Sequence, residues 1–253
     1  MKTEISTTTL VSAFITNANI YSKEDKYIIE KYLNNGILLL QTNIQKVIYV
    51  EQHIYNLLKQ YENEQTKFII IRKEDLYLYQ YKDVINNFHV NSINPEKDTL
   101  EYMLIICNKT EWVANTIINN QFPGSSNYVW VDFGIRYICK CSDEEFLKKV
   151  SSLGKKQYDK KIRIGQIWDL SIPRISLDIY RDIAWYFAGG IFGGDSDSVL
   201  KFAQWMKEKC VKIIQTNKTI MWEVNIWYLV YLEHPEIFDG FLCDHNDSLI
   251  DNY

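Results

Sequence analysis

Short runs of aliphatic and β-branched residues alternate with longer amphipathic runs along the first two thirds of the chain. The short runs predict strands over residues 7–16, 46–50, 67–71, 128–132 and 161–170. The longer runs predict helices over residues 26–43, 56–65 and 98–120, the last capped by Asp98 or Thr99. Strands that alternate with helices are typical of an α/β domain with a mostly parallel sheet.

The last third of the chain has a different pattern. The stretch GGIFGG, residues 189–194, places two glycine pairs before a segment that becomes helical. Apolar residues from Val199 to Ile213 recur at steps of three and four, which predicts an amphipathic helix capped by Asp195 or Ser196.

A second helix is predicted from residue 221 up to Pro235, and it is apolar on nearly all sides. Glu223 stands at its start, although an unpaired buried charge is costly. Two explanations account for a carboxylate at this position. It stabilises the start of the helix, where a negative charge is favoured, or it takes part in catalysis.

Composition fits one soluble globular domain of 253 residues. The chain has 28 Lys and Arg against 32 Asp and Glu, which gives a formal net charge of −4. Nucleic acid is therefore excluded as the main partner, because phosphate binding needs a basic face.

The five cysteines are odd in number and lack the paired spacing of a zinc site, so we expect free thiols in a reducing compartment. The N-terminus lacks a signal-peptide pattern and no apolar run is long enough to span a membrane. These features predict a cytoplasmic protein without a transmembrane segment. Peripheral attachment to a membrane is compatible with this prediction.

The stretch YVWVDFG, residues 128–134, contains the Asp-Phe-Gly triplet that holds magnesium in protein kinases. The chain lacks the other kinase motifs, a Walker A loop and a G-x-G-x-x-G fingerprint, which excludes those nucleotide-binding classes. Asp132 still lies where an apolar strand ends, and such a position suits a metal that bridges phosphates, or a ribose hydroxyl. Gly134 would let the chain turn there with a bound ligand close by. The alternative is an aspartate that only caps the following turn.

Several segments in fixed order give the chain a resemblance to the HtrL/YibB family of bacterial lipopolysaccharide-locus proteins, which are similar to glycosyltransferases of the GT-A fold. They are TTLVSAFI, NKTEWVANTI, NYVWVDFGI, AGGIFGG, WEVNIWYLVYLEHPEIF and DHNDSLIDNY. The resemblance implies a GT-A-like, Rossmann-like α/β sheet flanked by helices in a single domain over residues 1–253. Residues 1–135 would form the nucleotide-sugar-binding part and residues 136–253 the acceptor-binding part.

The resemblance also implies a donor site and a metal site. The donor would contact Phe14, Thr16, Lys109, Asp132 and Gly134. A divalent metal, Mn²⁺ or Mg²⁺, would be held by Asp132 with His245 or Asp244. Gly134 stands where GT-A enzymes have a second acidic residue, which leaves the metal requirement open. Lys109 as a solvated helix residue and His245 as a turn-capping residue are the ordinary alternatives.

The acceptor side is implied to contain Gly189, Gly190 and Trp222, with Glu223 as the catalytic carboxylate. In an inverting reaction Glu223 would take the acceptor proton, and in a retaining reaction a carboxylate would lie near the anomeric carbon instead. The alternatives are a tight turn at the glycines, a core position for Trp222 and a helix-end role for Glu223.

Together these inferences predict a glycosyltransferase that moves a sugar from a nucleotide-sugar donor, with UDP as the expected nucleotide, to a glycan hydroxyl, with metal assistance. The rival prediction is a non-catalytic protein with a degenerate GT-A site that binds a nucleotide sugar or a glycan. The absent second acidic residue favours this rival.

Overall fold

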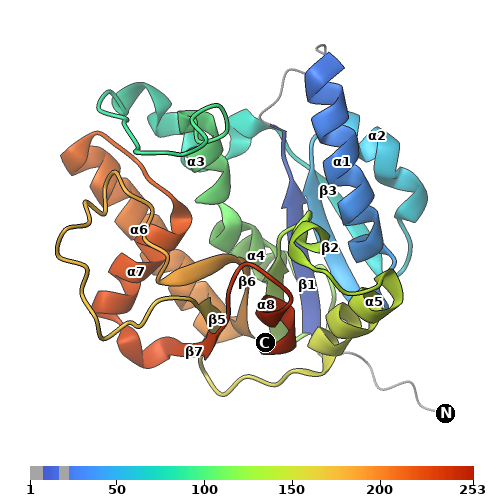
Figure 1. Cartoon of the computed structure of the whole chain (residues 1–253). Coiled ribbons are helices and arrows are strands. Elements are labelled where there is room, and N and C mark those ends of the chain that lie inside the picture. Colours follow the sequence, from blue (N-terminus) through green and yellow to red (C-terminus); the bar gives the residue numbers. More distant parts are fainter. Residues whose placement is uncertain (1–7, 17–22) are drawn as a thin grey trace.

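The structure is a computed structural model that describes residues 8–16 and 23–253, with side chains from residue 29 onward in the first helix. The described strands form one seven-stranded sheet in the order β3-β2-β1-β4-β6-β5-β7 (Figure 1). They are β1 (Thr8–Phe14), β2 (Gln45–Val50), β3 (Thr66–Ile70), β4 (Asn127–Val131), β5 (Ile162–Gln166), β6 (Phe187–Asp195) and β7 (Phe238–Leu242).

Six strands point the same way, and β6 runs against both of its neighbours, β4 and β5. The predicted α/β fold with a mostly parallel sheet in a single domain is therefore confirmed. The carboxyl ends of the parallel strands share one edge of the sheet, and β6 begins at that edge because it is antiparallel. The proposed division at residue 135 stays a prediction.

Helices cover both faces of the sheet. The first face packs against α3 (Leu100–Ile106), α4 (Lys109–Ile118), α6 (Ser196–Asn217) and α7 (Glu223–Glu233). The second packs against α1 (Lys23–Leu40), α2 (Gln52–Leu58), α5 (Asp143–Ser152) and α8 (Ser248–Asp251). In Figure 1 α3, α6 and α7 lie to the left of the sheet, and α1, α2 and α5 to its right.

Alternation along the strands explains why there are two cores. In β4, Tyr128 and Trp130 face the first core, whereas Val129 and Val131 face the second. All four are at most 2% exposed, since a central strand is covered on both sides.

Short 3₁₀ helices complete the chain at Lys59–Tyr61, Lys73–Asp75, Tyr79–Val84, Ile135–Ile138, Leu153–Lys155 and Pro235–Ile237. The predicted strands that became β1 to β5 agree with the structure within a few residues, although Thr7 lies outside the described part. The helix predicted over 56–65 lies earlier, at α2. The helix predicted over 98–120 is divided at Cys107 and Asn108, so that Lys109 begins a new helix.

Strand β6 was not predicted, because its glycines lack the β-branched side chains that mark a strand. The two later helices are found at α6 and α7, with Asp195 as the cap of α6. Its carboxylate accepts a hydrogen bond from the amide of Ser198. The glycine stretch is part of a strand rather than a turn, and Gly189 and Gly190 lie toward the edge where the parallel strands end.

All five cysteines are free, as predicted: Cys107, Cys139, Cys141, Cys210 and Cys243. Within the described residues, no helix combines the length and apolar character that a membrane crossing requires.

Lys46 in β2 is a buried cation, 1% exposed, whose ammonium donates to the carbonyl of Thr42 at 2.8 Å. Burial lowers the pKa of Lys46 to about 8, from an ordinary value of 10.5. A buried lysine that keeps its charge costs free energy, and this cost falls when the side chain loses its proton.

We therefore expect wild type to gain stability relative to Lys46→Met as the pH rises. Below pH 8 both the folded and the unfolded chain carry the charge, so the folded state bears the full cost. Between pH 8 and 10.5 the unfolded chain holds more protons, and the free energy of unfolding rises by about 3 kcal/mol relative to the variant. Urea denaturation of both proteins at pH 7 and near pH 10 measures this difference, and a constant difference contradicts it.

Candidate functional site

Residues from four separate elements meet at the edge where the parallel strands end. Asp132 directly follows β4, and its amide donates to the carbonyl of Gly190 in β6 at 2.9 Å. Lys109 is the first residue of α4, and Glu223 is the first residue of α7. The chain thus brings two carboxylates and one ammonium together from three distant segments.

Lys109 connects the two carboxylates. Its Nζ lies 2.9 Å from Oδ1 of Asp132 and 2.7 Å from Oε1 of Glu223, and it also donates to the carbonyl of Gly189 at 2.9 Å. We call Lys109, Asp132 and Glu223 the acid–lysine cluster. The indole N–H of Trp130 donates to Oδ1 of Asp132 at 2.7 Å, which fixes this carboxylate from the core side.

Burial differs within the acid–lysine cluster. The side chains of Lys109 and Glu223 are 8% and 7% exposed, whereas that of Asp132 is 39% exposed. A lysine in the first turn of a helix is electrostatically unfavourable, so Lys109 depends on its two carboxylates. Asp132 is the member that a solute can reach most easily.

Lys109 and the two carboxylates stabilise each other's charges, whereas the two carboxylates repel each other. Burial alone would lower the pKa of Lys109, but Asp132 and Glu223 raise it above its ordinary value. Burial raises the pKa of Glu223, Lys109 opposes this rise and Asp132 adds to it, so that the pKa is raised overall. A carboxylate with a raised pKa is a stronger proton acceptor, which suits a general base.

Gly189 makes room for Glu223. A Cβ atom at residue 189 would lie 2.5 Å from Oε1 of Glu223 and 3.3 Å from Val224. The glycine is therefore required by the packing of the catalytic candidate, whereas the sequence suggested a close approach by the acceptor.

We expect Gly189→Ala to displace the Glu223 carboxylate and to lower the free energy of unfolding by about 1–3 kcal/mol, the usual cost of overpacking. Gly134→Ala is the matched control, because the nearest atoms, at 3.0 and 3.3 Å, belong to the half-exposed ring of Tyr32, which can move aside. Urea denaturation should show a smaller loss for the control. Equal stability of Gly189→Ala and wild type would contradict this account.

The predicted donor residues lie on the β1 side of Asp132. Phe14 stacks on Phe133 with ring centroids 5.3 Å apart, and on Tyr32 at 5.9 Å. Phe133 is buried and belongs to the second core, so that Tyr32 is the exposed member of this stack. A Cβ atom at Gly134 would lie 3.0 Å from the ring of Tyr32, which places Gly134 beside the stack.

Thr16 is bonded to Glu51, a residue that the sequence did not single out. The amide and hydroxyl of Thr16 both donate to Oε2 of Glu51, at 2.7 and 2.6 Å. Glu51 directly follows β2, so it lies at the same sheet edge as Asp132. Its position at a strand end was the signal by which it could have been found.

Two predicted acceptor residues are packed inside the protein. Trp222 is 5% exposed and belongs to the first core, so its indole offers little face to a sugar. A Cβ atom at Gly190 would lie 2.9 Å from Leu249 of α8. Both residues therefore support the packing around the cluster in this structure.

Asp244 and His245 follow β7, at the same edge but on another part of it. His245 packs edge-on against Trp185 at 4.4 Å between ring centroids, and its Nδ1 lies 3.6 Å from Oδ1 of Asp244. The chain after β7 returns toward β6, since Leu249 packs where a Cβ atom of Gly190 would lie. Among the described residues, Asp244 and His245 do not join Asp132 in a group of side chains that could hold a metal.

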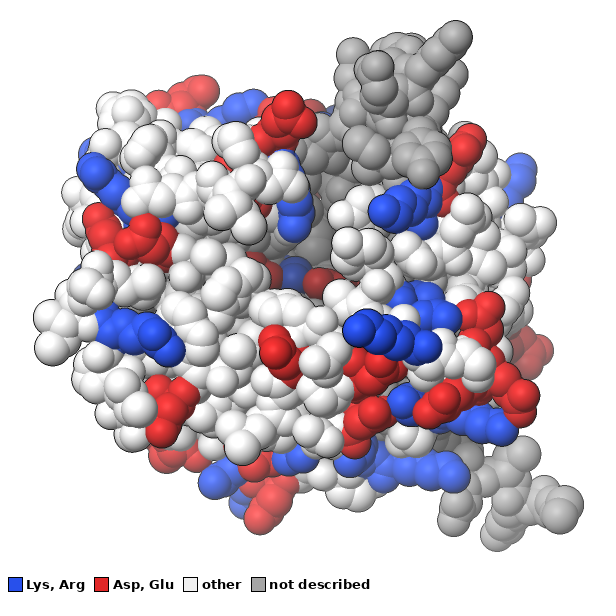
Figure 2. All heavy atoms as spheres, in the orientation of Figure 1, with Lys and Arg blue, Asp and Glu red and all other residues white. Residues whose placement is uncertain are grey.

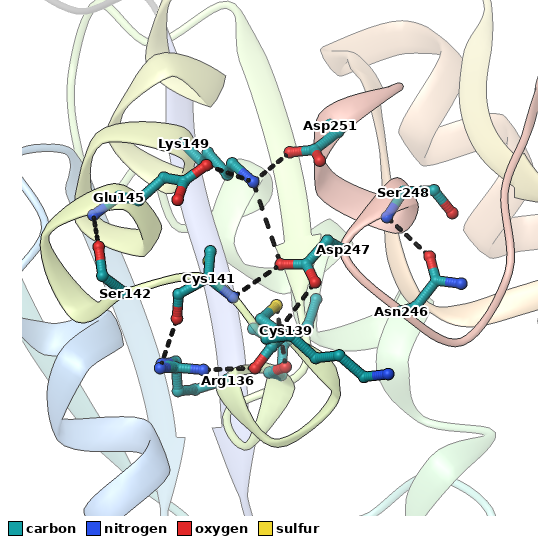
Figure 3. A network of polar contacts seen from close by, with 12 residues as sticks. Arg136, Cys139, Cys141, Ser142, Glu145, Lys149, Asn246, Asp247, Ser248 and Asp251 are labelled. Atoms are coloured by element: carbon teal, nitrogen blue, oxygen red, sulfur yellow. Dashed lines mark hydrogen bonds and ion pairs between the residues drawn. The ribbon is translucent and has the colours of Figure 1, made fainter.

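The segment that follows His245 is bonded to α5 and to the residues that precede α5 (Figure 3). Asp247 accepts hydrogen bonds from the amides of Lys140 and Cys141, at 2.8 and 3.3 Å. Lys149 of α5 pairs with Asp251 at 2.7 Å. This network fixes the position of the His245 segment.

The described residues suit a divalent metal only if the ligand supplies part of its coordination. No group of three or more histidine, cysteine or acidic side chains among them is arranged to hold a metal. The half-exposed carboxylate of Asp132 remains, and magnesium is often held by one carboxylate together with substrate phosphates. The site therefore suits a metal that arrives with a phosphorylated ligand.

Figure 2 shows a hollow near the middle of the displayed face, with acidic and basic atoms together on its floor and basic atoms on its rim. Two cavities lie near the acid–lysine cluster in sequence, but neither is lined by Lys109, Asp132 or Glu223. One, of about 110 Å³, is lined by Asn108, Glu111 and Trp112 of the α4 region, and another, of about 380 Å³, by residues 88–100.

The comparisons with known proteins concern family and fold. The family described as "Bacterial protein of unknown function (HtrL_YibB)" matches residues 6–249. No match is found among curated proteins. One similar solved structure is that of 4-diphosphocytidyl-2C-methyl-D-erythritol synthase from Anaerococcus prevotii DSM 20548. It has 9% identity, covers 94% of this chain and 89% of its own, and has a TM-score of 0.40.

Proposed function

The chain belongs to the HtrL_YibB family, and we propose that it is a glycosyltransferase that transfers a sugar from a nucleotide-sugar donor to a hydroxyl of a glycan. The observation that carries this proposal is the buried Glu223, joined through Lys109 to the accessible Asp132 at the edge where the parallel strands end. In open α/β sheets ligands bind at this edge. UDP is the first donor nucleotide to test.

Each part of the site has a role in this reaction. The nucleotide would lie on the β1 and β2 side, where Phe14, Thr16 and Glu51 lie at the same sheet edge as Asp132. The acceptor would approach from the β6 side, where Glu223 lies. Lys109 is a positioning residue in this account, because its bonds to both carboxylates set the distance between the two halves of the site.

In an inverting reaction the acceptor hydroxyl gives its proton to the Glu223 carboxylate as its oxygen bonds to the anomeric carbon. The bond from that carbon to the donor diphosphate breaks, and the diphosphate leaves with the electron pair. A divalent metal at Asp132 would neutralise charge on the diphosphate. The raised pKa of Glu223 and its burial favour proton acceptance.

A thermal-shift screen of nucleotide sugars, with and without manganese, tests the donor class. A ligand that binds the folded state stabilises it by mass action. Stabilisation by one nucleotide sugar together with release of its nucleoside diphosphate supports the enzyme. Stabilisation without turnover on any glycan supports the rival, a binding protein. No stabilisation by any donor contradicts the enzyme and a rival that binds a nucleotide sugar.

Asp132→Asn is expected to remain folded and to lose the stabilisation by donor that wild type shows with manganese. The amide keeps an acceptor oxygen for Trp130 and Lys109 but loses the charge that a metal or a ribose needs. Asp143→Asn is a suitable control, because this carboxylate also pairs with one cation, Arg136 at 2.9 Å, away from the cluster. A folded Asp132→Asn protein with an unchanged thermal shift would remove Asp132 from the donor site.

A further inference from the structure

Glu51 has a carboxylate oxygen that the fold does not use. Its Oε2 accepts hydrogen bonds from the amide and the hydroxyl of Thr16, at 2.7 and 2.6 Å. No described residue donates to Oε1, and this oxygen is not buried. Glu51 precedes α2, but its side chain makes no hydrogen bond to the start of that helix. One oxygen of the carboxylate is therefore fixed, and the other can accept a hydrogen bond from a ligand.

The anchor of this carboxylate is rigid, whereas its charge is unpaired. Thr16 is only 5% exposed, and Glu51 is partly exposed. Hydrogen bonds to an ionised acceptor are stronger than those between neutral groups, so the two bonds from Thr16 hold the side chain in one orientation. Within the described part of the chain, Glu51 forms no ion pair. No cation therefore competes with a ligand for Oε1.

Glu51 and Asp132 lie on the two sides of the end of β1. Strand β1 lies between β2, which Glu51 follows, and β4, which Asp132 follows. Two strand spacings, about 10 Å, separate β2 from β4. Phe14 joins the two sides, because it pairs with the last residue of β2 and its ring stacks on Phe133, the residue after Asp132, at 5.3 Å. One extended ligand can therefore reach both carboxylates.

The chemistry of Glu51 limits which part of a nucleotide it can bind. An ionised carboxylate accepts hydrogen bonds and donates none, so it binds hydroxyl or N–H groups and repels a diphosphate. The two ribose hydroxyls are neighbouring donors, and they are present whatever the base. The lone pairs of Oε1 can accept from both. Phosphates with a metal at Asp132 and ribose at Glu51 would satisfy both carboxylates.

We propose that Glu51 binds the vicinal diol of the donor's ribose through Oε1 and thereby selects ribonucleotides over 2′-deoxyribonucleotides. This proposal deepens the proposed function and rests on it for the class of donor. Asp132 keeps the phosphate side of the ligand, and Glu51 is assigned the nucleoside side. Thr16 is a positioning residue, because it acts through the carboxylate that it holds.

Isothermal titration calorimetry with manganese present tests the assignment, with UDP, GDP, CDP and ADP as probes, each beside its 2′-deoxy analogue. These probes carry no sugar to be transferred, so a diol effect can come only from the ribose. Wild type is expected to bind its preferred ribonucleotide about 10-fold or more tightly than the deoxy analogue, since a hydrogen bond to a charged group is lost. Glu51→Gln keeps an acceptor oxygen for Thr16 but loses the charge, so this affinity ratio should fall toward one.

Glu62→Gln is the matched control. Glu62 also accepts from a hydroxyl, that of Tyr55 at 2.8 Å, but it precedes β3 and so lies toward the opposite edge of the sheet. Its affinity ratio should equal that of wild type. The wild-type ratio needs no variant, so the test also holds if Glu51→Gln does not fold.

Three results would overturn the assignment. Equal wild-type affinity for a ribonucleotide and its deoxy analogue would do so. A folded Glu51→Gln protein that binds both more weakly by the same factor would show that Glu51 only anchors Thr16 or contacts the base. Both of these results leave the donor class standing. Wild type that binds none of the four nucleoside diphosphates overturns the assignment and the proposed function together.

Discussion

Glu223→Gln is expected to lower turnover by about 10²–10⁴-fold while donor affinity stays near that of wild type. Glutamine keeps the size of the side chain and an oxygen that accepts from Lys109, but it cannot take the acceptor proton. The binding residues on the β1 and β2 side are unchanged by this substitution. The measurement is the single-turnover rate with saturating donor and acceptor, together with donor affinity by calorimetry.

Glu233→Gln, at the other end of α7, controls for the loss of one negative charge from the same helix. Glu233 is exposed and pairs with Lys209 at 2.5 Å, away from the acid–lysine cluster. Its turnover should equal that of wild type. A Glu223→Gln protein with near-normal turnover would exclude Glu223 as the base. Asp195 and Asp197 could not replace it, because β6 ends at the opposite edge of the sheet, where Asp195 pairs with Asn127 at the start of β4 and caps α6.

Lys109→Met is expected to lower the free energy of unfolding by about 3–5 kcal/mol at pH 7, because it leaves a buried carboxylate without its partner. Without Lys109 the pKa of Glu223 should rise further above its unfolded value, since Lys109 is the group that lowers it. Stability from such a group is fully present below its unfolded pKa and is lost as pH rises through its folded pKa. The deficit should therefore shrink between pH 7 and pH 5.

Two variants make this prediction specific. Lys109→Met with Glu223→Gln should regain part of the lost stability at pH 7, because no buried charge then remains at residue 223. Lys207→Met removes a more exposed ion pair, to Glu111 at 3.0 Å, and should cost less than about 1 kcal/mol. A Lys109→Met deficit that does not depend on pH would show that lost packing, rather than an uncompensated carboxylate, is its cause.

The sequence predicted the sheet class well because buried parallel strands are short, apolar and separated by helices. It also identified Lys109, Asp132 and Glu223, each from a local irregularity or from the family resemblance. Their direct contact was not predictable, since it depends on three segments that meet only when the sheet is formed.

Other features left weak signals in the sequence. Strand β6 lacks the usual strand residues because side chains at its glycines would collide with neighbouring atoms, such as Glu223 at Gly189. Trp222 beside an acidic residue suggested a sugar platform, but the first core buries its ring.

The reversed direction of β6 has a consequence for how the protein can vary. Because β5 ends and β6 begins at the same edge, the connection between them, residues 167–186, starts and ends at the edge where the site lies and needs no crossover. A loop of this kind can change in length or composition while the sheet keeps its register. The later part of the connection is different, because the side chain of Asn225 bonds to the backbone of residues 179, 182 and 184. A change within these residues would reach α7, the helix that begins with Glu223.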